Sequence, residues 1–428
     1  MKLVNLKDDT QTVSFIEAVK TGLGRNQGVF FPTELVPLTD VDSLLAQPFA
    51  QRSAAILKHL IGDELPLDSL QSMCEQAFDF PAQLVQVEEN KYCLELFHGP
   101  TLAFKDFGGR FMAQCIGAFS QGERVTILTA TSGDTGAAVA HAFYQMPGVD
   151  VVILYPQGKI SLAQQKLFTT LGENIHCYAV EGSFDDCQAL VKQAFLDDEV
   201  KQTLGLNSAN SINISRLLAQ VCYYFEAFAQ LTVAEREQVH VSVPSGNFGN
   251  VCAAMIAAAL GLPVKRLSAT TNQNDTVPRY LDSGQWQPNA TLESISNAMD
   301  VSKPNNWPRV ESMLDSGYFP KYEFYSRSVS EERTQEVMRQ VAKGGYVTEP
   351  HTAIAYEGLQ LDGQPEETGI FLATAHPAKF RETVEAVLEQ AIEMPETLAS
   401  ALEKPCLAEP LSADYAALKQ AVLTRLVR

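Results

Sequence analysis

Apolar, strand-like runs alternate with helical segments through most of the chain, and this alternation restricts the fold more than any other feature. The runs lie at residues 125–130, 151–155, 175–180, 239–243, 264–269 and 369–374. Strands that are apolar on both faces belong to parallel sheets covered by helices. The pattern therefore predicts an α/β fold with doubly wound sheets. We expect two lobes around one cleft, roughly residues 91–235 and 236–390.

The two ends of the chain and one internal stretch depart from this alternation. Ser14 begins a capping-box pattern and helically spaced apolar residues fill 40–80, so we expect a separate, mostly helical N-terminal domain over 1–90. The main region then covers 91–428 and ends in a helical tail. Residues 271–328 are rich in Asn, Pro, Ser and Trp, which predicts a long insertion over a pocket.

The charge of the chain limits its partners. The net charge is −19, which argues against nucleic acid and anionic membranes, although a locally positive pocket could still take a small anionic substrate. No apolar run is long enough to cross a bilayer, and residues 1–9 lack a signal-peptide core. The eight cysteines form no C-x-x-C pair and the seven histidines show no metal-ligand spacing. We expect a cytoplasmic protein, able to act as a monomer, with reduced thiols and no metal.

One lysine, Lys105, follows Phe104 and lies two residues before Phe107, with no other basic residue until Arg110. A lysine in apolar surroundings loses the solvation of its ammonium form, so its pKa falls and its amine becomes a nucleophile. That is the condition for Schiff-base chemistry. The alternative interpretation is a surface lysine at a helix start.

Two glycine-rich turns, residues 131–136 and 245–250, each lie between a buried strand and a helix. Backbone amides and a helix N-terminus make such turns suited to anions, although any tight turn between strand and helix can use Gly and Asn. Neither turn matches a nucleotide-binding motif. Together with Lys105 they suggest pyridoxal phosphate and a carboxylate-bearing substrate, one turn for each anion. A non-catalytic module that binds an anionic metabolite would not need Lys105.

Six segments, in order, resemble the threonine synthase family, in its longer bacterial and fungal form. They are residues 22–32, 98–110, 131–136, 207–216, 245–250 and 373–380. The resemblance covers most of the chain and implies the fold type II architecture of pyridoxal-phosphate enzymes. It also implies the last step of threonine biosynthesis, in which O-phospho-L-homoserine and water give L-threonine and phosphate by γ-elimination and β-addition.

The same resemblance assigns roles to single residues. Lys105 would bind the cofactor as a Schiff base and afterwards carry protons. Thr374 would contact the pyridine nitrogen, and Asp134 stands where many relatives carry an asparagine near the 3-hydroxyl. The cofactor phosphate would be held by Gly246, Asn247, Phe248, Gly249 and Asn250.

Substrate contacts are expected from the other turn and from two cations. Ser132, Gly133 and Thr135 would bind the substrate carboxylate, and Arg216 and Lys159 are candidates for its phosphate. Arg216 could instead form a salt bridge on a helix face, and Lys159 could be an ordinary surface lysine. The competing activities belong to other enzymes of the same fold. One is a serine/threonine dehydratase, and the other is a phospholyase that releases 2-oxobutyrate from phosphohomoserine.

Overall fold

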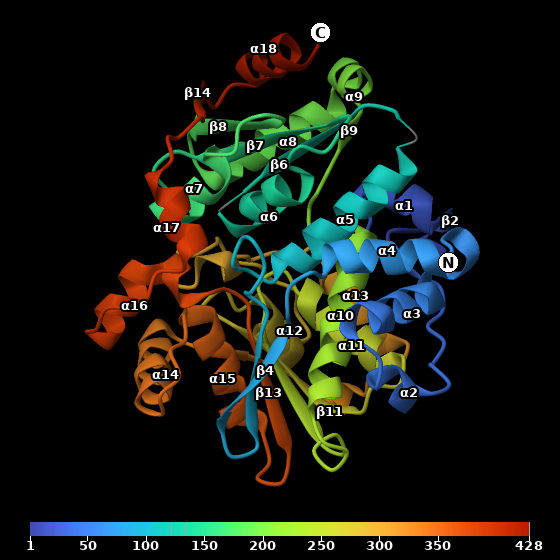
Figure 1. The fold of residues 1–428 in the computed structure, drawn as a ribbon, viewed down its shortest axis with the longest axis vertical. Coiled ribbons are helices and arrows are strands. Elements are labelled where there is room, and N and C mark those ends of the chain that lie inside the picture. Colours follow the sequence, from blue (N-terminus) through green and yellow to red (C-terminus); the bar gives the residue numbers. More distant parts are fainter. Residues whose placement is uncertain (121, 132, 428) are drawn as a thin grey trace.

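The computed structural model describes residues 1–120, 122–131 and 133–427, and two sheets organise it (Figure 1). The larger sheet has six strands in the order β12-β11-β10-β13-β5-β4, all parallel except the β4–β5 pair. Helix α15 (Pro350–Asp362) packs against β10, β11 and β13. The strands are β4 (Gln83–Glu88), β5 (Lys91–Glu95), β10 (Val239–Pro244), β11 (Val264–Thr271), β12 (Phe324–Ser328) and β13 (Thr368–Ala373).

The smaller sheet has five parallel strands in the order β14-β8-β7-β6-β9. Alternate residues of β7 enter two different hydrophobic clusters, one on each face, because helices cover both faces. This is the expected pattern for continuous apolar strands. The strands are β6 (Val125–Ala130), β7 (Val149–Pro156), β8 (Ile175–Glu181), β9 (Leu206–Asn207) and β14 (Glu409–Ser412).

Helices cover both sheets and fill the space between them, as Figure 1 shows. The helices of the central and C-terminal parts are α5 (Lys105–Phe119), α6 (Asp134–Phe143), α7 (Leu162–Thr169), α8 (Phe184–Leu196), α9 (Asp198–Leu204), α10 (Ile214–Gln230), α11 (Gly249–Ala259), α14 (Glu331–Lys343), α15 (Pro350–Asp362), η5 (Pro377–Phe380), α16 (Arg381–Leu388), α17 (Glu396–Glu403) and α18 (Tyr415–Leu426).

The N-terminal region contains a small antiparallel sheet, of which the sequence did not predict strands β1 and β2. Its strands β1 and β2 are rich in polar residues, so they lack the apolar pattern of the later strands. Ser14 caps α1 as predicted, because its hydroxyl accepts a hydrogen bond from the amide of Glu17. The elements are β1 (Lys2–Asn5), β2 (Asp8–Ser14), α1 (Phe15–Thr21), η1 (Arg25–Gln27), β3 (Phe30–Pro32), α2 (Val41–Leu45), α3 (Phe49–Ile61), η2 (Gly62–Glu64) and α4 (Leu67–Ala77).

The ranges predicted for the two lobes do not coincide with the two sheets. Strand β5 begins the 91–235 range, yet it pairs with β13 in the larger sheet. The C-terminal tail returns to the smaller sheet, where β14 pairs with β8. Figure 1 shows this tail passing from α16 to α18 along one side of the molecule. Strand pairing between distant segments depends on tertiary packing, which local sequence patterns do not specify.

The 271–328 stretch is more regular than expected. It contains α12 (Thr276–Ser283), η3 (Asn297–Met299), α13 (Trp307–Asp315), η4 (Lys321–Glu323) and the edge strand β12. Arg309 of α13 is fully buried and donates hydrogen bonds to the carbonyl oxygens of Phe30 and Ile212. The stretch is thus tied to two other parts of the chain.

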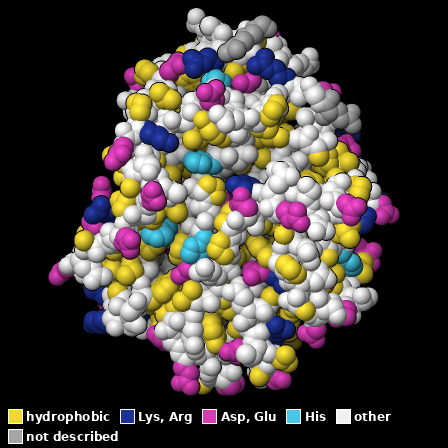
Figure 2. Space-filling view, viewed as in Figure 1, with side chains coloured by type: hydrophobic (Ala, Val, Ile, Leu, Met, Phe, Trp, Pro, Cys, Tyr) yellow, Lys and Arg dark blue, Asp and Glu magenta, His cyan; other side chains and the backbone are white. Residues whose placement is uncertain are grey.

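Several expected properties can be compared with the described residues. Among them, no helix is long and apolar enough to cross a membrane. All eight cysteines are free thiols, and only Cys406 is exposed. On the face shown in Figure 2, basic side chains are scattered among acidic ones rather than gathered in a broad patch.

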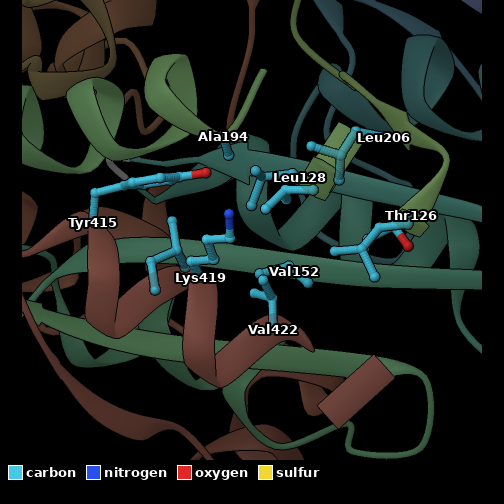
Figure 3. Close-up of a pocket in the computed structure, with 11 residues that line it drawn as sticks. Thr126, Leu128, Val152, Ala194, Leu206, Tyr415, Lys419 and Val422 are labelled. Atoms are coloured by element: carbon cyan, nitrogen blue, oxygen red, sulfur yellow. The ribbon is translucent and has the colours of Figure 1, made fainter. Parts of the chain in front are cut away.

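A small apolar cavity lies under α18, between the helix and strands β6 and β7 (Figure 3). Its volume is only about 10 Å³, no more than one water molecule requires. Leu128, Val152 and Val422 line it, and Lys419 at its edge forms ion pairs with Asp197 and Glu199. We interpret the cavity as a packing defect of the core.

Candidate active site

Lys105 is the first residue of α5, and its side chain is mostly buried. Its Nζ atom lies 5.0 Å from the centre of the Phe104 ring and 3.7 Å from Oδ2 of Asp134. Burial lowers the pKa of Lys105; the Asp134 carboxylate opposes this effect, while the charges of Lys379 and Arg216 add to it. The net lowering of the pKa makes the free amine more available, as the sequence predicted.

Two glycines bring α5 unusually close to its neighbours. A Cβ atom at Gly108 would lie 3.1 Å from the carbonyl oxygen of Arg216, and one at Gly109 would lie 3.2 Å from that of Ala138. The Gly-Gly pair therefore marks a close backbone approach, which a side chain at either position would prevent. Because α5 packs against both α6 and α10, the start of α5 lies near residues of both helices.

The loop that leads to Lys105 is held against the end of β13. The amide of Phe104 donates to the carbonyl oxygen of Thr374 at 2.9 Å, and the amide of His376 donates to that of Leu102 at 3.0 Å. Thr374 is buried at this point. These backbone bonds bring the predicted cofactor lysine and the predicted ring-nitrogen partner to the same place.

The turn at 245–250 joins β10 to α11 through tightly approaching backbone. A Cβ atom at Gly246 would lie 2.7 Å from Cα of Met299. Phe248 caps α11 with a φ of +59°, and its ring packs edge-on against Trp307 at 5.7 Å. Asn250 closes the turn, since its Nδ2 atom donates to the carbonyl oxygen of Pro244 at 2.9 Å.

This turn fits the expected cofactor phosphate. The first amides of a helix have no partner within the helix, and they carry partial positive charge. Asn306 lies beside the turn: its backbone amide donates to the carbonyl oxygen of Asn247, while its buried Nδ2 atom has no hydrogen-bond partner among the described residues. Nδ2 of Asn306 would lie 3.3 Å from a Cβ atom at Gly249. A buried donor without a partner is costly, and a bound anion would satisfy it.

The turn at 131–136 is fastened by one hydroxyl. Oγ1 of Thr131 accepts hydrogen bonds from the amides of Gly133 at 2.9 Å and Gly136 at 2.8 Å. Thr135 is half-buried in the first turn of α6, where amides lack partners within the helix. Ser132, a predicted carboxylate contact, lies outside the described residues.

Asp134 begins α6 and faces two lysines. Its Oδ1 atom lies 2.6 Å from Nζ of Lys379 and accepts a hydrogen bond from Nε2 of Gln164 at 3.2 Å, while Oδ2 faces Lys105. Burial alone would raise the pKa of Asp134, but the two ammonium charges outweigh burial and the pKa falls below its usual range. The side chain is therefore ionised at neutral pH, so it accepts hydrogen bonds and cannot donate one.

Lys379 is the main site residue that sequence reasoning missed. It lies in η5, its side chain is fully buried, and its Nζ atom also donates to the carbonyl oxygen of Thr101 at 2.8 Å. Its sequence context, Pro-Ala-Lys-Phe, carries no local signal of a site. Its membership of the 373–380 segment was the one available pointer.

Arg216 is a buried cation with no carboxylate partner in the part of the chain that the structure describes. Burial lowers its pKa to about 10, so it stays charged at neutral pH. Its guanidinium donates to the carbonyl oxygen of Ala209, its Nε atom has no partner, and it forms no ion pair among the described residues. Such a group is suited to an anionic ligand.

Lys159 differs from these buried residues in its exposure to solvent. It is exposed on the turn after β7, and within the described parts of the chain it forms no ion pair. Its role in binding the substrate phosphate stays a prediction.

A cleft of about 540 Å³ opens beside Lys379 and Gln164. This volume suits a small-molecule site. Gln164 comes from α7, Arg381 from α16, and Ser294 and Asn297 from the 271–328 stretch. The cleft is therefore lined both by α7, which packs against β8 of the smaller sheet, and by the 271–328 stretch, which contributes β12 to the larger sheet.

Three family models match the chain. Residues 81–373 match the model of pyridoxal-phosphate dependent enzymes. Residues 4–78 match the threonine synthase N terminus, and residues 352–422 match the threonine synthase C-terminal model. Together the models cover nearly the whole chain.

Similar proteins and structures agree with these models. The chain is 58% identical to the threonine synthase of Serratia marcescens over 422 residues, which are 98% of each chain. The crystal structure of threonine synthase from Escherichia coli matches with a TM-score of 0.95 and 57% identity over 99% of this chain and 100% of that one. A threonine synthase from Brucella melitensis with bound PLP matches with a TM-score of 0.92 and 32% identity over 99% of this chain and 98% of that one. The predicted fold class and cofactor are confirmed, and the chain belongs to the threonine synthase family of pyridoxal-phosphate-dependent enzymes.

Proposed function

We propose that this protein converts O-phospho-L-homoserine and water to L-threonine and phosphate. The observation that carries the proposal is a mostly buried lysine amine, with a lowered pKa, near a buried arginine that has no carboxylate partner among the described residues. Two anion-suited turns accompany this pair. A substrate with a carboxylate and a phosphate, together with a cofactor phosphate, matches this set of groups.

The cofactor would be held by residues from four segments. Lys105 would bond to it, the amides of 246–250 would bind its phosphate, and Thr374 would contact its ring nitrogen. Asp134, as an ionised carboxylate, would accept a hydrogen bond from a donor near the 3-hydroxyl of the cofactor. When bound, pyridoxal phosphate supplies an electron sink for negative charge that develops on the substrate carbons.

The protein supplies proton transfer and charge. The Lys105 amine can accept a proton from a substrate carbon and return it, because its lowered pKa lies closer to neutral pH. Arg216 would neutralise the substrate phosphate as it leaves, with the forked geometry that phosphate favours. The substrate carboxylate would lie against the turn of Gly133 and Thr135, where the amide of Thr135 in the first turn of α6 could donate to it. This arrangement would fix the orientation of the substrate between its two anionic ends.

A product assay tests the proposal. Purified protein with pyridoxal phosphate and O-phospho-L-homoserine should release threonine and phosphate in equal amounts. Release of 2-oxobutyrate with ammonia and phosphate would instead identify a lyase of the same fold. Binding of the substrate without turnover would identify a non-catalytic binding protein.

The substrate is a small molecule in this proposal, and neither nucleic acid nor a membrane is required. We also propose a cytoplasmic location and activity as a monomer, in line with the sequence. Fractionation of cells and analytical ultracentrifugation of the purified protein are the measurements that check them.

A further inference from the structure

Lys379 and Lys105 share one carboxylate unequally. The Nζ atom of Lys379 lies 2.6 Å from Oδ1 of Asp134, whereas the Nζ atom of Lys105 lies 3.7 Å from Oδ2. The shorter contact is a close ion pair, and the longer one exceeds hydrogen-bonding distance. Among the described residues, Asp134 is the only carboxylate within ion-pair distance of either ammonium group. The carboxylate is therefore engaged mainly by Lys379.

The contacts of Lys379 also join three separate segments. Its side chain is fully buried in η5, and it bonds both to Asp134 at the start of α6 and to the carbonyl oxygen of Thr101 in the loop before Lys105. That loop is fixed in turn by Asp106, whose carboxylate accepts hydrogen bonds from the amide and hydroxyl of Thr101. One ammonium group thus sets the position of the carboxylate relative to the amine.

We propose that Lys379 is a positioning residue, which holds the Asp134 carboxylate away from the Lys105 amine and so keeps that amine free to bond with the cofactor. The proposal rests on the assignment of Lys105 as the cofactor lysine. Without Lys379, Asp134 would pair with Lys105 alone and stabilise its ammonium form. The unprotonated fraction of Lys105 at neutral pH would then fall.

Other charged groups surround the pair and stay in place when Lys379 is replaced. Arg216 from α10 adds positive charge near Lys105, and His351 from α15 lies close enough to Asp134 to influence the pKa of that carboxyl. The charge of Lys379 also acts on Asp106, His141 and His376. The change specific to Lys379→Met is therefore the loss of one cation and the release of one carboxylate.

The experiment follows the uptake of pyridoxal phosphate by full-length protein from which the cofactor has been removed. The rate of uptake is measured by absorbance across a pH series, and its midpoint reports the protonation of the attacking amine. We expect Lys379→Met to raise this midpoint by about one pH unit, because a unit charge within a few ångströms shifts a pKa by about that much or more. Below the midpoint, uptake would slow about tenfold.

Two further variants make the test specific. Asp134→Asn removes the shared anion, so its midpoint should fall, opposite in sign to Lys379→Met. Lys58→Met is the matched control, because Nζ of Lys58 also donates to a backbone carbonyl, that of Gly62 at 3.0 Å, and to a carboxylate, that of Asp63 at 3.0 Å, but in the N-terminal region. Its midpoint should equal that of the wild type.

An unchanged midpoint in folded Lys379→Met protein, checked by circular dichroism, overturns the proposal, as do shifts of the same sign in both site variants. If Lys379→Met does not fold, Asp134→Asn still decides, since a raised or unchanged midpoint contradicts a shared carboxylate. Borohydride reduction and peptide mass spectrometry identify the bonded lysine. A label on Lys379 overturns both this proposal and the Lys105 assignment, whereas a label on Lys105 with an unchanged midpoint overturns the positioning role alone.

Discussion

Replacing Arg216 by methionine should stabilise the cofactor-free protein while it removes activity. Burial lowers the pKa of Arg216 to about 10, well below the usual value for a guanidinium. At 1.36 kcal/mol for each pH unit, this difference corresponds to about 3 kcal/mol of unfavourable burial of the charge. The variant loses one hydrogen bond to Ala209, worth about 1–2 kcal/mol. The free energy of unfolding should therefore rise by about 1–2 kcal/mol.

Arg309→Met is the matched control, because burial also lowers the pKa of Arg309 to about 10. Unlike Arg216, Arg309 has its donors satisfied by the carbonyl oxygens of Phe30 and Ile212 and by Oδ1 of Asn306. Its removal leaves three buried acceptors unpaired, at about 1–3 kcal/mol each. After the gain from removing the charge is subtracted, we expect a net loss of about 3 kcal/mol.

Urea unfolding of the cofactor-free proteins measures the two stabilities, and steady-state kinetics measures the function. Arg216→Met should lower kcat/KM by about a hundredfold, the equivalent of roughly 3 kcal/mol for a lost bidentate contact with a charged group. Inorganic phosphate should raise the Tm of the wild type more than that of the variant. The reasoning is refuted if Arg216→Met destabilises the protein as much as Arg309→Met does and responds to phosphate like the wild type.

Three further predictions follow from the site and its supports. Lys105→Ala should lose the borohydride-reducible link to the cofactor; a label that persists at another lysine, seen by mass spectrometry, would contradict the assignment. Gly246→Ala places a Cβ atom 2.7 Å from Cα of Met299, so overpacking of about 1–3 kcal/mol should weaken cofactor binding at least tenfold in a fluorescence titration; unchanged affinity would show that the turn does not bind the phosphate. Burial raises the pKa of Asp106 to about 6, so this carboxyl favours the folded state below pH 4 and that contribution is lost as the pH rises to about 6. Asp106→Asn should therefore gain stability relative to the wild type, by up to about 3 kcal/mol, between those pH values in urea unfolding, and a constant difference would refute this.

Much of the local structure was readable from the sequence. The apolar runs at 125–130 and 239–243 became strands β6 and β10, because a continuous run of apolar residues can be buried only inside a covered sheet. Ser14 became a helix cap, since its hydroxyl needs only an amide three residues away. The prediction for Lys105 rested on the same kind of information, because Phe104 and Phe107 lie close to it in sequence.

Tertiary structure alone decided the features that join distant segments. The sequence does not show that β5 pairs with β13, because strand partners are chosen by packing of whole layers. It does not show that Lys379 reaches Asp134, which lies 245 positions earlier in the chain, or that Arg216 has no carboxylate partner among the described residues. Charge and burial depend on which side chains meet in space. The proposal of Lys105 as the reactive lysine thus rested on local information, whereas the electrostatic setting of that lysine was decided by the fold.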